Sequence, residues 1–182
     1  MLWFRTGFVI VYYAAMSLDG RISGPDHDLS FLKTLTGKEN DYEEFYVAVD
    51  SLIMGAGTWE FVVRHGSWPY GWKPTWIVTH AQSLAPLAGA ELVETFAGDV
   101  RELVRLIESR GLKRTWLVGG GDLAGQFLAA DLLDELILTV APTLVGAGPA
   151  LADGEFPLRT FELVGQEPFG DNGFRLRYER SR

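Results

Sequence analysis

Short apolar runs of strand length recur along most of the chain. The first, residues 8–16, is rich in Val, Ile and Tyr and nearly continuous, which is typical of a strand buried on both faces. Further runs of this kind predict buried strands at residues 51–54, 75–78, 115–118 and 135–141. Segments with the apolar spacing of helices lie between many of these strands.

Helix-like spacing separates these strands. Apolar residues recur every three or four positions in residues 28–35, 45–49 and 99–112, and again after Gly121. The third segment is the clearest, because Asp99 is a residue type that caps helix N-termini and Gly111 one that ends helices. Alternating strands and helices predict an α/β fold with a mostly parallel sheet.

The last part of the chain changes pattern. Residues 161–164 and 174–178 have the composition of two strands, and the turn-forming residues 171–173 precede the second. Apolar and charged residues alternate in 174–179, which predicts a strand with Arg175, Arg177 and Glu179 on a solvent-facing side. We therefore expect a single domain over residues 1–182, with a mixed, mostly parallel central sheet that ends in a C-terminal antiparallel hairpin.

Composition narrows the classes of function. The chain has 24 acidic and 16 basic residues and a net charge of -8, which disfavours nucleic-acid binding by phosphate neutralisation. It has no cysteine, which excludes disulfides and thiolate nucleophiles, and its three histidines are not paired at a ligand spacing, so we expect no metal site. Residues 8–16 are too short to span a bilayer and have strand-like rather than signal-peptide composition. We expect a cytoplasmic protein with a small-molecule substrate and no membrane association.

Glycine-rich turns follow two of the predicted strands. Gly119, Gly120 and Gly121 precede a helix, where residues without Cβ let phosphates approach the N–H groups at its positive end. Residues 55–58 repeat this arrangement after an earlier strand. Because ligands of open α/β sheets bind beyond the carboxyl ends of the strands, the two turns predict one long ligand, such as a dinucleotide. A third glycine cluster, residues 146–148, is equally consistent with a plain loop.

Two carboxylates are candidate proton donors. Asp19 follows the first strand and precedes Gly20, so turn formation is the alternative role. Asp28 precedes the helical pattern of residues 28–35, where capping is the alternative. A capping carboxylate at a pocket rim can still donate a proton when burial raises its pKa. We take Asp28, directly or through water, as the first candidate and Asp19 as the second.

Five short motifs stand in a fixed order along the chain. They are AMSLDGRI at residues 15–22, LIMG at 52–55 with Thr58, LVGGG at 117–121, LDEL at 133–136 and PTLVGAG at 142–148. Together they resemble the dihydrofolate-reductase-like family, in particular the group related to the C-terminal reductase domain of bifunctional riboflavin-biosynthesis deaminase-reductases. The resemblance implies a three-layer α/β/α fold and NADPH as cofactor.

The same resemblance implies which residues contact the coenzyme. The end of the first strand would face the nicotinamide, and the two glycine turns with the loop after residues 75–78 would hold the rest. The implied contacts are Ala15, Gly55, Ala56, Gly57, Thr58, Thr79, His80, Val118, Gly119, Gly120, Gly121, Asp122 and Leu123. Residues 28–36 are also similar to a helix start of dihydrofolate reductases, which puts Asp28 at the position of their pterin-binding carboxylate.

The chain departs from its relatives in its basic residues. Ala56 and Gly57 stand where relatives often carry basic residues, which leaves His80, Lys73 and Arg64 as substitutes for holding a 2′-phosphate. A riboflavin-pathway substrate would also need basic residues around its ribose phosphate, and the sequence shows no obvious cluster of them.

The function implied by the resemblance is an NADPH-dependent oxidoreductase. It would transfer a hydride to a small pterin- or pyrimidine-like heterocycle, or to a carbonyl or imine. The alternative is a non-catalytic dinucleotide-binding or regulatory domain on the same fold. The apolar Leu136, Ile137, Leu138 and Val140 and the closing hairpin predict a homodimer.

Overall fold

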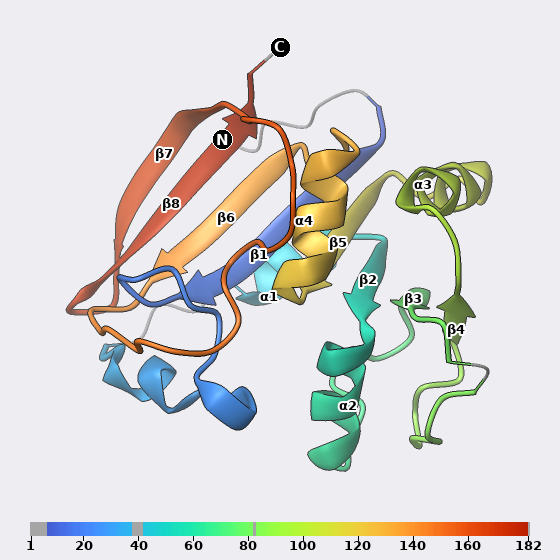
Figure 1. The fold of residues 1–182 in the computed structure, drawn as a ribbon, viewed down its shortest axis with the longest axis horizontal. Coiled ribbons are helices and arrows are strands. Elements are labelled where there is room, and N and C mark those ends of the chain that lie inside the picture. Colours follow the sequence, from blue (N-terminus) through green and yellow to red (C-terminus); the bar gives the residue numbers. More distant parts are fainter. Residues whose placement is uncertain (1–6, 38–41, 82, 182) are drawn as a thin grey trace.

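The computed structural model describes residues 7–37, 42–81 and 83–181, and there eight strands form one sheet (Figure 1). The strands are β1 (Val9–Met16), β2 (Ser51–Gly55), β3 (Thr75–Val78), β4 (Val93–Phe96), β5 (Arg114–Gly119), β6 (Glu135–Val140), β7 (Phe161–Phe169) and β8 (Gly173–Arg180). Their order across the sheet is β4-β3-β2-β5-β1-β6-β8-β7. The pairs from β4 to β6 are parallel, and β8 is antiparallel to both β6 and β7. The predicted mixed sheet with a closing antiparallel hairpin is confirmed.

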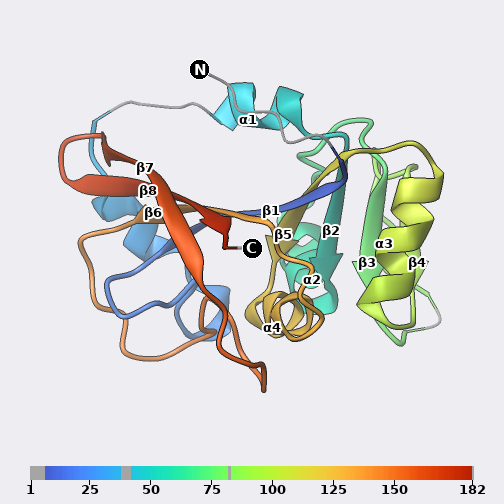
Figure 2. The same cartoon turned by 90° about the horizontal axis from the view of Figure 1, so that it is seen from above.

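Helices cover both faces of this sheet. They are α1 (Tyr42–Ala48), α2 (Ala56–Arg64), α3 (Val100–Ser109) and α4 (Gly121–Ala129), with short 3-10 helices at Pro25–His27 and Ser30–Thr34. Figure 2 shows α1 and α4 on opposite sides of β1. The predicted three-layer α/β/α arrangement is therefore confirmed.

The two faces of the sheet bury separate cores. Ile10 and Tyr12 of β1 pack in the cluster that contains residues of α3 and α4, whereas Val11 packs with Phe45 of α1 and Trp116 of β5. Successive side chains of a strand point to opposite faces, so β1 supplies both cores. This double burial explains why residues 8–16 are almost continuously apolar.

Most predicted elements have the expected positions. The N-cap of α3 is Asp99, whose side chain accepts a 2.7 Å hydrogen bond from the Arg101 backbone N–H. Three elements differ from the prediction. The strand β7 continues to Phe169, beyond the predicted residues 161–164. Residues 28–35 form only the 3-10 helix Ser30–Thr34, and β4 was missed because its sequence, VETF, is not an apolar run. The acidic residues 39–41 of the predicted helix before Phe45 lie outside the described residues.

The prediction of a solvent-facing charged side on β8 is confirmed for Arg177, which is exposed, and is wrong for Arg175. Arg175 is 3% exposed, whereas its apolar neighbour Phe174 is 53% exposed. The Arg175 guanidinium lies 4.4 Å from the ring centroid of Phe169 and 5.5 Å from that of Tyr13, and it donates to Tyr13 Oη over 3.2 Å. Aromatic faces and this hydroxyl take the place of water around the cation, so the charge can be buried.

The strand β6 does not offer the dimer face that the sequence suggested. Ile137 and Leu138 are buried, and Leu136 packs against the core shared with α3 and α4. The edge strand β7 instead exposes Leu163 and Val164. The homodimer stays a prediction, and the exposed apolar residues of β7 are its expected interface. Light scattering, which measures the mass in solution, would test it.

Candidate functional site

One cavity opens where the parallel strands end. Its volume is about 820 Å³, and it lies beyond the carboxyl ends of β1, β2, β3 and β5. All the residues that the resemblance implied as coenzyme contacts line it: Ala15, Gly55, Ala56, Gly57, Thr58, Thr79, His80, Val118, Gly119, Gly120, Gly121, Asp122 and Leu123. Parallel strands bring their carboxyl ends to the same edge, which is why residues so far apart in sequence meet here. Their contact with a coenzyme stays a prediction.

The N-termini of two helices meet in this cavity. Gly55 is the N-cap of α2 and Gly120 is the N-cap of α4, and the strands that lead into them are adjacent and parallel. A Cβ atom on Gly55 would stand 3.7 Å from the backbone nitrogen of Gly120. Each helix N-terminus carries partial positive charge and N–H groups without intrahelical partners. Together they form a seat for an anionic group such as a diphosphate.

Each glycine of the LVGGG motif is required for a different physical reason. A Cβ on Gly121 would lie 2.2 Å from the backbone oxygen of Ala150, so this glycine is needed for close packing inside the protein. Gly119 has a φ of +134°, and a cis peptide bond joins it to Gly120. A Cβ on Gly120 would meet nothing nearer than Thr58 Oγ1, at 3.9 Å. Gly120 is therefore the position where a missing side chain leaves space for a ligand.

Several lining residues were not anticipated from the sequence. Tyr12 and Tyr13 point to opposite faces of the sheet, yet both line the cavity, which therefore wraps around the end of the sheet. Tyr12 Oη donates a 2.9 Å hydrogen bond to the backbone oxygen of Leu151, and burial raises the pKa of the Tyr12 phenol. Tyr70 and Trp116 also line the cavity. No short motif marks these residues, because only the fold brings them together.

Asp19 joins the loops that follow β1 and β6. Its carboxylate accepts hydrogen bonds from Ser17 Oγ (2.6 Å), Val145 N (2.9 Å) and Gly146 N (2.7 Å). The Ser17 hydroxyl, followed by the two backbone N–H groups, holds the pKa of Asp19 well below its usual range. Asp19 is not among the residues that line the cavity. These contacts support the turn alternative, because an ionised carboxylate already used as an acceptor is a poor proton donor.

We expect Asp19→Asn to lower the melting temperature at neutral pH. The pKa of Asp19 is lower in the folded than in the unfolded chain, so its stabilising effect is complete above about pH 4 and is lost as the pH falls further. The difference in melting temperature between parent and variant should therefore shrink in acid. Asp26→Asn is the control, since Asp26 has no side-chain hydrogen bond among the described residues. A difference that does not depend on pH would contradict this role of the charge.

Asp28 holds the start of the 3-10 helix Ser30–Thr34. Its carboxylate accepts hydrogen bonds from the backbone N–H of Ser30 (2.8 Å) and from Ser30 Oγ (2.7 Å). These bonds, with the hydroxyl first, lower the pKa of the exposed Asp28 carboxyl. Asp28 lines a small hollow beside the main cavity but not the cavity itself. The N-cap of this helix is Leu29, so the predicted capping role of Asp28 is replaced by a turn one residue earlier. The lowered pKa disfavours Asp28 as a proton donor, and that role stays an untested prediction.

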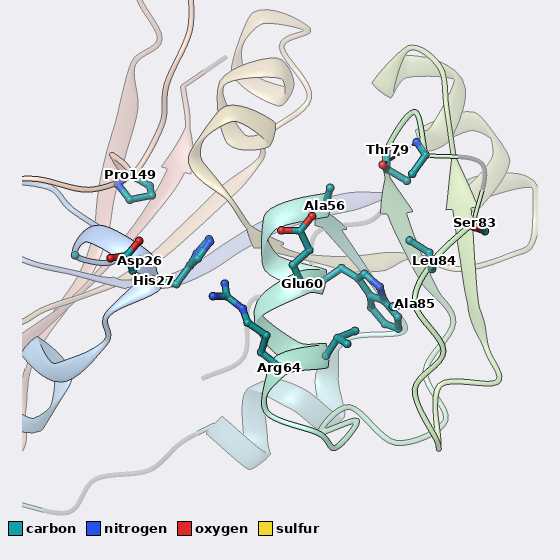
Figure 3. Close-up of a pocket in the computed structure, with 14 residues that line it drawn as sticks. Asp26, His27, Ala56, Glu60, Arg64, Thr79, Ser83, Leu84, Ala85 and Pro149 are labelled. Carbon is teal, nitrogen blue, oxygen red and sulfur yellow. Dashed lines mark hydrogen bonds between the residues drawn. The ribbon is translucent and has the colours of Figure 1, made fainter.

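A second hollow, of about 770 Å³, adjoins the main cavity. The two share the lining residues His27, Ala56, Thr79 and Pro149. Figure 3 shows Arg64 of α2 and His27 pointing toward one another across this hollow, with Glu60 on the same helix. Because the two spaces share a wall, the hollow lies within reach of an elongated ligand seated on the two helix N-termini.

The three basic residues predicted to hold a 2′-phosphate lie in different places. Arg64 lines the second hollow, and His80 lines the main cavity. The proposal for Lys73 is wrong. Its ammonium lies 4.6 Å from the ring centroid of Tyr46 and donates to the backbone oxygen of Val49, so other contacts occupy it away from both spaces.

The described residues were also compared with the requirements of a metal site and of a membrane-spanning helix, and they meet neither. Within residues 7–37, 42–81 and 83–181, no three Asp, Glu or His side chains come together as a metal site. None of the helices in this described part of the chain has the length and apolar character needed to cross a membrane.

Comparisons with known proteins show the family of this chain. Residues 68–173 match the family model described as the RibD C-terminal domain. The chain is also 31% identical over 175 residues to the uncharacterized protein YwjB of Bacillus subtilis, a similarity that covers 94% of this chain and 97% of YwjB.

Solved structures show the same fold. A candidate riboflavin biosynthesis protein from Shewanella sp. PV-4 has a TM-score of 0.88 and 26% identity, covering 96% of this chain and all of the other. A Thermotoga maritima protein named as a deaminase and 5-amino-6-(5-phosphoribosylamino)uracil reductase has a TM-score of 0.67 and 16% identity, covering 96% of this chain and 57% of its own. Enterococcus faecalis dihydrofolate reductase, solved with NADP(H), has a TM-score of 0.64 and 16% identity, covering 97% and 100%.

Proposed function

Because this chain belongs to the RibD C-terminal domain family, we propose that it is an NADPH-dependent reductase that transfers a hydride to a small heterocyclic, carbonyl or imine substrate. The family is one of reductase-like proteins with the dihydrofolate reductase fold. The observation that carries the proposal is the meeting of the α2 and α4 N-termini at Gly55 and Gly120, with open space in front of Gly120.

The residues of the cavity fit a dinucleotide. The seat at Gly120 has no side chain to exclude a diphosphate, and Thr58 Oγ1 beside it can donate a hydrogen bond. From this seat, the main cavity runs to the end of β1, and the adjoining second hollow is lined by Arg64. A dinucleotide is an elongated molecule with a central diphosphate, which is the shape that this arrangement suits.

NADPH, when bound, supplies the hydride, and the reduction of one double bond consumes this hydride and one proton. The chain's part is to orient the two reactants and to exclude water. Small residues at the end of β1, among them Ala15, leave room for a flat ring, and Tyr12 fixes the neighbouring segment through its bond to Leu151. In our proposal the proton comes from solvent water, because the Asp28 carboxyl does not line the cavity and accepts two hydrogen bonds that lower its pKa.

Calorimetry with NADPH tests this function. We expect a dissociation constant on the order of 10 µM or tighter, and oxidation of NADPH when pterins, pyrimidines or quinones are added. If NADPH raises the melting temperature but no acceptor accelerates its oxidation, the alternative of a non-catalytic dinucleotide-binding domain is favoured. Absence of any heat with NADPH and NADH would refute the proposed site.

Arg64 should distinguish NADPH from NADH. The Arg64 side chain lines the second hollow, where it can pair with the additional phosphate of NADPH. We expect Arg64→Gln to weaken NADPH binding by about 10-fold, the effect of one charge-assisted hydrogen bond, and to leave NADH binding unchanged. Arg105→Gln, on the exposed side of α3, is the matched control. Equal losses for both coenzymes would show that Arg64 does not read the phosphate.

A further inference from the structure

The main cavity has an aromatic wall on the α1 side of the sheet. We use this name for Tyr13, Tyr70 and Trp116, which line the cavity there together with Leu29 and Leu32. The glycine seat lies at the ends of β2 and β5, beside α4. If the seat holds the coenzyme, as proposed above, the aromatic wall is the part of the cavity left for the acceptor.

The aromatic wall is held in place from behind. Tyr13 stacks on Phe45 with ring centroids 4.2 Å apart and 16° between the planes. Trp116 meets Tyr13 edge-on at 5.9 Å and Tyr70 at 5.4 Å, and its Nε1 donates to the backbone oxygen of Tyr13 over 3.1 Å. Such packing fixes the rings before any ligand arrives. A fixed set of ring faces and edges is suited to a flat partner.

The described residues that line the main cavity carry no permanent positive charge, and their basic side chains are His27 and His80. Among the described residues that line the main cavity there is no Lys or Arg, whereas Asp122 and Asp153 are present. Arg175 does not line the cavity, and its guanidinium donates hydrogen bonds to Tyr13 Oη and to Thr139 Oγ1. A phosphate at this wall would lose water without gaining a charged partner, which is unfavourable.

We propose that the acceptor of this protein is a planar, uncharged ring that carries no phosphate. This inference rests on the proposed function and specifies its substrate class. It separates this chain from the Thermotoga maritima protein, whose name specifies a phosphoribosyl substrate. The same fold then serves a different acceptor, because the residues at the wall bind rings and do not bind phosphate.

Matched pairs of ligands test the proposal in the parent protein. The pairs are 5-amino-6-ribosylaminouracil with its 5′-phosphate, and riboflavin with riboflavin 5′-phosphate, each titrated into protein saturated with NADP⁺ and again without it. We expect the neutral member of at least one pair to bind about 10-fold tighter than its phosphate, or more. A phosphate that binds as well as its neutral partner, or no binding of either neutral ring, would overturn the inference. A parallel titration with NADPH shows separately whether the coenzyme site exists.

Variants of Tyr70 locate the binding. Tyr70→Leu removes one ring of the aromatic wall and should weaken binding of the neutral ring by about 10-fold, whereas Tyr70→Phe keeps the ring and should stay within about 3-fold. Trp72→Leu is the control, because Trp72 is exposed and does not line the cavity. Parent-like binding by a folded Tyr70→Leu protein would refute the wall as the site. The matched pairs decide the proposal even if a variant does not fold, since they need the parent protein alone.

Discussion

We expect Gly120→Val to weaken the proposed NADPH binding by about 100-fold or more and to leave the protein folded. Gly120 has a φ of −84°, which other residues adopt freely, and a Cβ there would have 3.9 Å of clearance to Thr58 Oγ1. The Cβ of the new side chain would therefore lie in the seat in front of the helix N-termini, with no protein atom closer than Thr58 Oγ1. A 100-fold loss corresponds to about 2.7 kcal/mol, the effect of two charge-assisted hydrogen bonds.

Calorimetry measures this loss, and circular dichroism checks the fold. Gly165→Val is the matched control, because Gly165 lies in the edge strand β7, away from the cavity, and a branched residue suits a strand. It should bind NADPH like the parent. If folded Gly120→Val protein keeps its affinity within a few fold, the diphosphate does not lie where we place it.

Gly125→Ala should lower the free energy of unfolding by about 3 kcal/mol. A Cβ on Gly125 would stand 1.7 Å from the backbone oxygen of Asp153, so α4 or the segment around residue 153 has to move. For a chain of this length, the loss corresponds to a melting temperature lower by roughly 6 to 12 °C. Differential scanning calorimetry measures both quantities.

The control for this prediction is Gly57→Ala. Gly57 is also a helical glycine, but a Cβ there would meet only His27 Cε1, at 3.6 Å, which is an ordinary contact. Alanine favours a helix over glycine by up to about 1 kcal/mol, so this variant should be as stable as the parent or more so. Equal destabilisation by both substitutions would show that the approach of Asp153 is not the cause.

Much of the fold and of the coenzyme site could be predicted. The strands were recognisable because a strand buried on both faces needs apolar residues at nearly every position, as in residues 8–16. Asp99 marked the start of α3 through local capping chemistry. The glycine turns converge on one cavity because parallel strands place their carboxyl ends together, a rule of topology that needs no side-chain detail.

Other features depend on contacts between distant residues. The sequence pattern put Arg175 on a wet surface, but the rings of Tyr13 and Phe169 bury it. Gly121 was expected to serve a ligand, and its missing side chain is also required by the nearby backbone of Ala150. The sequence made Asp19 a candidate proton donor. In the structure its carboxylate accepts three hydrogen bonds, two of them from backbone N–H groups in the loop after β6, which the sequence pattern does not reveal.

The sequence by itself determined the α/β class and the positions of most strands, because hydrophobic period, capping and turn chemistry are local properties. The family resemblance, and not these local properties, named the residues expected around the glycine-rich cavity. Only the tertiary structure decided that Gly120 faces open space, that Gly121 and Gly125 face backbone, and that an aromatic wall without a described Lys or Arg completes the cavity. These features arise where segments far apart in the chain come within a few ångströms of each other, and no local pattern records that approach.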